Sequence, residues 1–196
     1  VLALVNNDVE VISPGWLHEL VSLAIRPDVG CVGAKLYYPD RRIQHAGVVI
    51  GVAGGAGHIH QYRDFDDPGH FQRLKVRQEF MAVTGACLVV RRKVFDEVGG
   101  LNETDLAIAY NDIDFCLKVH AQGYRNIWTH KAELFHFESA SRGHENTLDK
   151  QLRFGREAAY MTRTWRFDVV QDPFYNPNFS RQSLDFKVGM PEWPFP

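Results

Sequence analysis

Apolar side chains fall into short runs and helical repeats that together predict an α/β protein. Residues 1–5 form an apolar run with two valines, which is typical of a buried parallel strand. Apolar positions recur at helical spacing within residues 14–26 and 146–165, and Ser13 followed by Pro14 favours a capped helix start. Further strands are predicted at residues 29–36, 43–50, 79–90, 124–129 and 132–137, and further helices at residues 92–98 and 112–122.

Two segments interrupt this pattern. Residues 51–70 are rich in Gly, His and Asp, which predicts a solvated, mobile loop, and their histidine spacing matches no standard zinc motif. The tail from residue 172 holds five of the nine prolines, so we expect it to lie along the surface or to fold over the site. The chain therefore divides into a domain at residues 1–171 and a Pro-rich tail at residues 172–196.

The bulk composition is that of a globular protein without a strong charge. Of its 196 residues, 45% are hydrophobic and 23% are charged, which suffices for one buried core. The net charge of -2 and the isoelectric point near 6.5 exclude long-range attraction to nucleic acid or anionic lipid. No apolar stretch reaches the length of a membrane span, and no signal peptide is recognisable.

Cysteine usage indicates a reducing compartment. Cys31, Cys87 and Cys116 lie far apart in apolar surroundings and form neither a disulfide framework nor a zinc pattern. Thiols of this kind are usually reduced core residues, because cytosolic proteins rarely contain disulfides. We therefore expect a cytoplasmic protein, which could be membrane-peripheral in its full-length form.

Polar residues follow the first apolar run directly. Asn6, Asn7 and Asp8 would lie at the C-terminal end of a strand, where ligands bind in open α/β sheets. A carboxylate at that position can hold a hard divalent cation, which in turn binds phosphate oxygens. Asn and Asp are also ordinary turn residues, so a plain strand-to-helix turn is the alternative.

A second polar cluster opens the helix predicted at residues 112–122. Acidic side chains near a helix N-terminus interact favourably with the helix dipole. With Asn111 as the N-cap, Asp114 can return a hydrogen bond three residues later, which accounts fully for Asp114. It accounts only in part for Asp112, which is left as a candidate for chemistry.

Two further positions have both a structural and a functional interpretation. Thr84 and Gly85 lie inside a predicted strand, where Gly indicates either a β-bulge or the close approach of another group. His136 lies at the end of the last predicted strand. A histidine at a strand end can be a structural residue or a metal ligand, and the residues alone leave both interpretations open.

In their order and spacing, four polar segments resemble the second half of a family 2 glycosyltransferase with the GT-A fold. The resemblance is closest to rhamnosyltransferase-like bacterial members and covers about residues 1–143. It implies a Rossmann-like, mostly parallel mixed sheet flanked by helices. Because the chain begins with Val1 inside a strand, we expect a fragment that lacks the N-terminal nucleotide-binding half. The segments are Asn6-Asn7-Asp8, Thr84-Gly85-Ala86-Cys87, Asn111-Asp112-Ile113-Asp114 and His136-Phe137-Glu138-Ser139.

The resemblance implies transfer of a sugar, with inversion, from a nucleotide-diphosphate donor to a hydroxyl of a glycan acceptor. Asn6-Asn7-Asp8 resembles the Asp-x-Asp motif of the family with its first acid replaced, so Asp8 is implied as a metal ligand and Asn6 as an uncharged donor contact. His136 is implied as the second ligand of a Mg²⁺ or Mn²⁺ ion, which would stabilise the leaving diphosphate. Arg142 is a candidate for a further contact to that diphosphate, with His144 as the weaker alternative.

The same resemblance assigns the acceptor side of the reaction. Asp112 falls on the position of the general base, which takes the proton from the attacking hydroxyl. Thr84, Gly85 and Asn111 are implied as lining of the acceptor pocket, with Asn111 in place of an acid of the family motif.

Two other functions stay open at this point. Because Asn6 and Asn111 replace acids, the chain could be an inactive GT-A-like binding or assembly module. A nucleotidyltransferase also uses strand-end carboxylates with Mg²⁺. We further expect the isolated chain to be catalytically incompetent, with its first strand as an exposed edge through which copies could pair.

Overall fold

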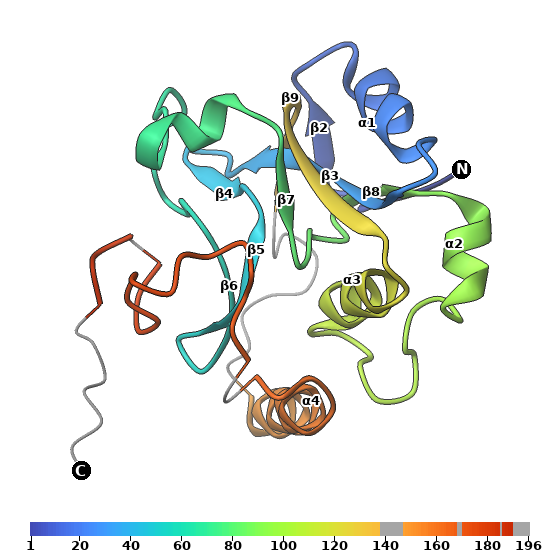
Figure 1. Ribbon diagram of the computed structural model, residues 1–196, viewed down its shortest axis with the longest axis vertical. Coiled ribbons are helices and arrows are strands. Elements are labelled where there is room, and N and C mark those ends of the chain that lie inside the picture. The colour runs from blue at the N-terminus through green and yellow to red at the C-terminus, as the bar shows by residue number, and fades with distance from the viewer. Residues whose placement is uncertain (138–146, 168–169, 185, 190–196) are drawn as a thin grey trace.

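The computed structural model describes residues 1–137, 147–167, 170–184 and 186–189 (Figure 1). Helices cover a mixed β-sheet on both faces, which confirms the α/β class. The strands are β1 (Leu2–Val5), β2 (Val9–Val11), β3 (Val29–Tyr37), β4 (Ile43–His45), β5 (Val48–Val52), β6 (Gly55–His58), β7 (Gln78–Phe80), β8 (Cys87–Val90) and β9 (Arg125–His136). The helices are α1 (Trp16–Ala24), the 3₁₀ helix η1 (His70–Lys75), α2 (Arg92–Glu97), α3 (Asn111–Ala121) and α4 (Leu148–Trp165).

The sheet is mostly antiparallel, so the prediction of a mostly parallel sheet is wrong. Its strand order is β1-β8-β3-β9-β2, with β4 paired to β3 and β7 paired to β9. Among the described strands, only β3 and β9 pair in parallel. A short apolar run shows that a strand is buried but contains no information about its direction, which depends on partners distant in the sequence.

Strand β1 is an edge strand, not the buried parallel strand predicted for residues 1–5. Among the described strands it pairs with β8 alone, in antiparallel register from Leu2 opposite Val90 to Val5 opposite Cys87. Its side chains alternate between half-buried and exposed, and Val5 is 41% exposed. The outer edge is therefore open in this structure, as expected, while pairing between copies of the chain stays a prediction.

Alternation along the central strands separates two layers of the core. On β3, Cys31 and Tyr37 pack against the face that also carries α3, α4 and the β5–β6 hairpin. Val32 and Leu36 point to the opposite face, where they pack with Leu20 of α1. Because β3 is buried on both faces, its sequence is apolar apart from Lys35 and shows no alternation.

Several boundaries differ from those predicted. The strand predicted at residues 79–90 is interrupted between β7 and β8, whereas the two strands predicted at 124–129 and 132–137 are the single strand β9. The loop predicted at residues 51–70 contains β6, which pairs with β5. Ser13 is not a helix cap, because Gly15 holds that position and the Ser13 hydroxyl hydrogen-bonds Glu133 instead.

The described part of the tail packs against the β5–β6 hairpin. One carboxylate oxygen of Asp172 accepts a hydrogen bond from the Ile50 N–H, at 2.9 Å. The Arg181 guanidinium donates to the carbonyl of Gly51, and the buried Phe186 ring packs near His60. These contacts hold residues 172–184 and 186–189 against the domain, and the division at residue 171 stays a prediction.

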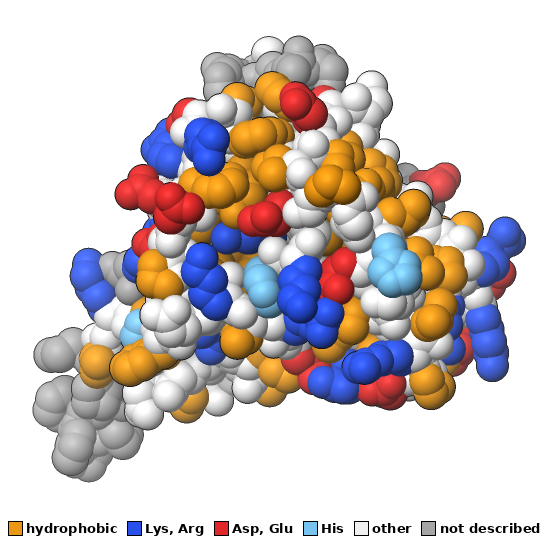
Figure 2. Space-filling view, turned by 90° about the horizontal axis from the view of Figure 1, so that it is seen from above, with side chains coloured by type: hydrophobic (Ala, Val, Ile, Leu, Met, Phe, Trp, Pro, Cys, Tyr) orange, Lys and Arg blue, Asp and Glu red, His pale blue; other side chains and the backbone are white. Residues whose placement is uncertain are grey.

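One expectation from composition agrees with the structure. All three cysteines are buried and free, as predicted for reduced core residues. Within the described ranges, none of the helices combines the length and apolarity that crossing a membrane requires. The face of the molecule seen in Figure 2 carries acidic and basic side chains interspersed with hydrophobic ones, in keeping with the small net charge.

Candidate functional site

Strand pairing brings together the two residues predicted to hold a metal. Asp8 lies in the turn between β1 and β2, and His136 is the last residue of β9. Because β2 pairs with β9 so that Val9 is opposite His136, Asp8 comes next to the end of β9. The Phe137 N–H also donates to the Asp8 carbonyl at 2.9 Å, which fixes the backbone of this turn.

The His136 ring is oriented by its neighbours on both sides. Its Nδ1 lies 2.8 Å from the Gln44 side-chain oxygen, and the Gln44 amide nitrogen donates to the His136 carbonyl at 3.4 Å. Since an amide oxygen only accepts, this arrangement places the proton of a neutral ring on Nδ1. The Nε2 lone pair then faces the Asn6 amide nitrogen at 3.1 Å and an Asp8 carboxylate oxygen at 3.3 Å.

The carboxylate oxygen of Asp8 is the least satisfied group of this site. Asp8 Oδ1 is buried and has no hydrogen-bond partner among the described residues. Asp8 Oδ1 therefore faces the lone pair of His136 Nε2, which also accepts from the Asn6 amide, and the Asp8 oxygen is left without a donor unless a proton or a cation lies between it and the ring. A protonated His136 would satisfy the oxygen, and so would a divalent cation with mixed O and N ligands.

The residues present fit a divalent cation in part. Metal-bound histidines usually donate their second ring N–H to an acceptor, and His136 does so to Gln44. The described residues contain no group of three or more His, Cys, Asp and Glu side chains that could hold a metal. Further ligands would then come from Asn6, water or substrate oxygens, as is common for Mg²⁺.

The candidate base, Asp112, is held by backbone N–H groups at the start of α3. One of its oxygens accepts from the Gly85 N–H at 2.8 Å and the other from the Ile113 N–H at 2.8 Å. A carboxylate has about four lone-pair sites, so each oxygen keeps capacity for a proton or a hydroxyl. Asp112 is only half-buried, so a substrate hydroxyl could reach it.

Gly85 allows the close approach of Asp112. A Cβ atom added at Gly85 would lie 3.1 Å from the Asp112 Cβ atom, which is closer than most real contacts of this kind. Gly85 lies between β7 and β8, so it is not a bulge inside a continuous strand. Of the two interpretations of this glycine, the structure favours close approach of another group.

The two halves of the candidate site are joined by residues 84–86. The Asn6 N–H donates to the Ala86 carbonyl at 3.0 Å, on the side of the Asp8–His136 pair. The neighbouring Gly85 binds Asp112 on the other side. The structure thus connects the predicted donor, acceptor and base residues through one turn.

Asn111 directly precedes Asp112 as the first residue of α3, and Arg142 and His144 lie outside the described residues.

Helix capping at α3 differs from the prediction. Tyr110, with φ of 63°, holds the N-cap position that was predicted for Asn111. Asp114 is 2% exposed and accepts a hydrogen bond from the Trp165 indole N–H at 2.8 Å, while its other oxygen lies 3.2 Å from the Lys118 ammonium group. The bond from Trp165 ties α3 to α4, and the ion pair with Lys118 lies within α3. Both contacts are those of a structural residue, although capping is not among them.

Sequence reasoning missed Gln44, His45 and His58. The first two are 4% and 0% exposed, and they interrupt an otherwise apolar run at residues 43–50. His45 lies 2.9 Å from His58, measured between the two Nδ1 atoms. Two adjacent polar residues inside this apolar run were the available signal, because buried polar groups need specific partners.

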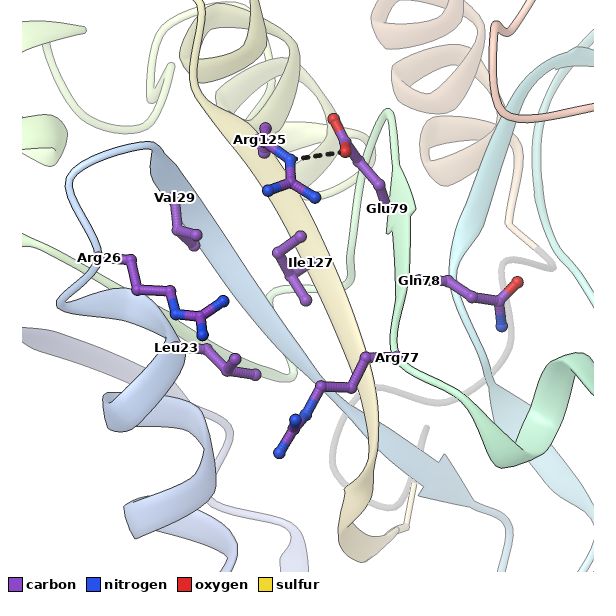
Figure 3. A pocket seen from close by; sticks show the side chains of 8 residues that line it. All are labelled: Leu23, Arg26, Val29, Arg77, Gln78, Glu79, Arg125 and Ile127. Atoms are coloured by element: carbon purple, nitrogen blue, oxygen red, sulfur yellow. Dashed lines mark hydrogen bonds and ion pairs between the residues drawn. The ribbon is translucent and has the colours of Figure 1, made fainter.

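A small cavity lies at the opposite end of the sheet. It has a volume of about 130 Å³ and is near the starts of β3 and β9, whereas His136 ends β9 (Figure 3). Arg125 pairs with Glu79 there, as the dashed line in Figure 3 marks, and Arg77 pairs with Glu19. The charged side chains that line the cavity are thus mostly paired, and none of the lining residues belongs to the candidate site. The lining comprises Leu23, Arg26, Val29, Arg77, Gln78, Glu79, Arg125 and Ile127.

Two curated proteins are similar to this chain over nearly its whole length. The chain is 60% identical over 193 residues to the uncharacterized protein y4gI of Sinorhizobium fredii, which covers 98% of this chain and 21% of that protein. It is 39% identical over 186 residues to the O-antigen biosynthesis protein RfbC of Myxococcus xanthus, which covers 94% of this chain and 14% of that protein. The chain thus spans about a fifth of the first relative and less of the second. No family model matches the chain.

Proposed function

We propose that this chain is part of a glycosyltransferase of polysaccharide biosynthesis. It would transfer a sugar from a nucleotide-diphosphate donor to a hydroxyl of a glycan acceptor, with inversion. One observation carries the proposal. Residues 84–86 form a turn that hydrogen-bonds Asn6, beside the facing Asp8 and His136 side chains, and also hydrogen-bonds the half-buried carboxylate of Asp112. The similarity to a protein named for O-antigen biosynthesis supports the polysaccharide part of the proposal.

On the donor side, Asp8 and His136 would hold a divalent cation, either Mg²⁺ or Mn²⁺. When bound, such a cation stabilises the negative charge that develops on the leaving diphosphate. Gln44 keeps the His136 ring in the tautomer whose Nε2 is unprotonated, so His136 is ready to act as a ligand. Asn6 contributes polar contact without charge, which predicts weaker cation binding than a site with two acids would have.

On the acceptor side, Asp112 would act as the general base. The acceptor hydroxyl attacks the anomeric carbon from the face opposite the diphosphate, and the bond to the diphosphate breaks as the new glycosidic bond forms. The hydroxyl proton passes to Asp112, whose orientation is fixed by the N–H groups of Gly85 and Ile113. No protein nucleophile takes part, which is why this chemistry inverts the sugar.

The proposal concerns a domain of a larger protein. The chain spans 21% and 14% of the lengths of the two relatives, so donor recognition would also use residues from outside this chain. We keep the expectation that the isolated chain binds nucleotide weakly and transfers no sugar. Its three buried free thiols support a reducing, cytoplasmic site of action.

Substitutions in the active protein that contains this sequence test the proposal. Asp112→Asn keeps the shape of the side chain but cannot accept a proton, so kcat should fall by ~10² to 10⁴ with little change in donor affinity. Asp8→Ala should reduce activity by ~10² or more, and EDTA should have a similar effect on the unsubstituted protein.

Asp114→Asn is the matched control for these changes, because Asp114 lies on the same helix turn but faces Trp165. It should lower stability and leave kcat near its original value. Full turnover by Asp112→Asn, or loss of turnover only in Asp114→Asn, would overturn the assignment of the base. Indifference to EDTA would remove the metal from the proposal.

A second candidate function is a binding or assembly module without catalysis. It is favoured by the finding that the described residues contain no group of three or more side chains suited to a metal. Titration of the 196-residue chain with Mn²⁺ separates the two, since the enzyme proposal expects binding that Asp8→Ala abolishes. Absence of Mn²⁺ binding, together with no sugar transfer by the protein that contains this sequence, would favour the module.

A further inference from the structure

Two histidines form a buried pair next to the candidate site. His45 on β4 is fully buried, and its Nδ1 atom lies 2.9 Å from the Nδ1 atom of His58 on β6. The rings meet edge to face, with centroids 4.9 Å apart. At this distance one nitrogen must donate and the other must accept, because two lone pairs or two protons would repel each other.

The neighbouring backbone decides which nitrogen donates. The Thr84 N–H points at His45 Nε2 from 3.4 Å, and a backbone N–H can only donate. Nε2 is therefore unprotonated, so a neutral His45 carries its proton on Nδ1 and donates it to His58. Burial, together with the nearby rings of His58 and His136, holds the pKa of His45 well below its usual range, so the ring stays neutral.

The group that His45 holds is the turn that joins the two halves of the site. Thr84 begins the segment whose next residue, Gly85, donates its N–H to Asp112. The residue after that, Ala86, accepts from the Asn6 N–H. The Thr84 side chain also accepts from the Ala86 N–H within the turn itself. His45 thus contributes a contact to the turn from outside the candidate site.

We propose that His45 and His58 form a positioning pair that sets the Thr84–Ala86 turn, and with it the placement of the Asp112 carboxylate relative to the Asp8–His136 pair. The inference deepens the proposed function and rests on it for its catalytic consequence, while its structural part stands on hydrogen bonds alone. Neither histidine touches substrate in this scheme. His58 accepts the Nδ1 proton of His45, His45 accepts from the Thr84 N–H, and the turn presents the Gly85 N–H to Asp112.

Two substitutions at His45 separate its two hydrogen bonds. His45→Gln retains an acceptor at about the reach of Nε2 but loses the donor at the Nδ1 position. His45→Asn retains a donor near the Nδ1 position but is too short to accept from Thr84. If the turn depends on the acceptor, the Gln variant should behave like the unsubstituted protein and the Asn variant should not.

The structural readout is NMR on the 196-residue chain. Imidazole ¹⁵N shifts should show His45 with its proton on Nδ1 and His58 with an unprotonated Nδ1. Exchange of the Gly85 amide proton should be ~2- to 10-fold faster in His45→Asn, as expected for loss of one hydrogen bond, and close to normal in His45→Gln. The opposite tautomers, or equal exchange in both variants, would overturn the inference.

The catalytic readout separates this inference from the proposed function. In the active protein, His45→Asn should lower kcat by ~10- to 100-fold with the donor KM unchanged, because misplacing a base affects the chemical step. His45→Gln should restore kcat. If the protein transfers no sugar at all, the proposed function fails while the NMR result still decides the positioning role. Equal loss of kcat in both variants would reduce His45 to a packing residue.

Discussion

Acid should destabilise the fold through His60, a buried histidine where residues 60–70 meet the tail. His60 is 2% exposed, its Nε2 accepts a hydrogen bond from the His70 N–H at 3.1 Å, and its ring packs 4.7 Å from that of Phe186. Burial, reinforced by the positive charges of Arg63 and Arg73, lowers its pKa to about 3. The folded state therefore resists protonation of this ring.

The size of the effect follows from the difference between the two states. The pKa of an unperturbed histidine is 6.5, so between that value and about 3 the unfolded chain binds a proton that the folded chain does not. The contribution of His60 to the free energy of unfolding is therefore fully present above the pKa of the unfolded state, and it is lost as the pH falls from that value towards the pKa of the folded state. Each pH unit corresponds to about 1.4 kcal/mol, so acidification to about pH 4.5 should cost about 2–3 kcal/mol.

Urea denaturation at about pH 7 and about pH 4.5 measures this loss. His60→Gln can still accept from the His70 N–H but does not titrate, so its loss of unfolding free energy on acidification should be smaller by about 2–3 kcal/mol. His130→Gln is the matched control: His130 is half-buried and its pKa is lowered less by burial, so that variant should recover less. Equal pH dependence in His60→Gln and the unsubstituted chain would refute the reasoning.

Three further substitutions test other parts of the structure. Asp114→Asn should retain the bond from Trp165 but lose the ion pair, lowering the free energy of unfolding in urea by about 1 kcal/mol. Asn6→Asp adds a carboxylate beside His136, so calorimetry should show Mn²⁺ binding tighter on the order of tenfold, and unchanged affinity would contradict the cation site. Asn126→Leu removes the side-chain partner of one buried N–H and two carbonyls, so thermal unfolding should reveal a loss of about 3 kcal/mol or more.

Helices were more predictable from this sequence than the sheet. The spacing of apolar residues located α1, α3 and α4, because one face of each packs on the core and leaves a periodic signal. Strand direction could not be predicted, because the pairing of β1 with β8 depends on residues far apart in the chain. The capping error at Tyr110 has a local cause, since a left-handed tyrosine before a helix has no strong sequence signature.

The candidate site was predictable where the resemblance named residues. It led to Asp8 and His136, which the structure brings to 3.3 Å, and to Asp112 and Gly85, which it joins by a hydrogen bond. It did not lead to His45, because the role of that side chain depends on the β4 register and on the β5–β6 hairpin. Interactions that arise from tertiary pairing leave only a weak trace in sequence, here a polar pair within an apolar strand.

The pairing of β2 with β9 has a consequence for how the chain folds. Asp8 directly precedes β2, near the start of the chain, whereas His136 ends β9, the last of the described strands. Their contact therefore forms only after β9 has paired with β2 and β3. Closing a loop of that length costs chain entropy, and topologies rich in such distant pairings fold slowly. A cation that binds both residues would cross-link the two strands that close the longest loop of the described sheet. Part of its binding free energy would then add to the free energy of unfolding, so a cation bound for catalysis would also stabilise the strand order.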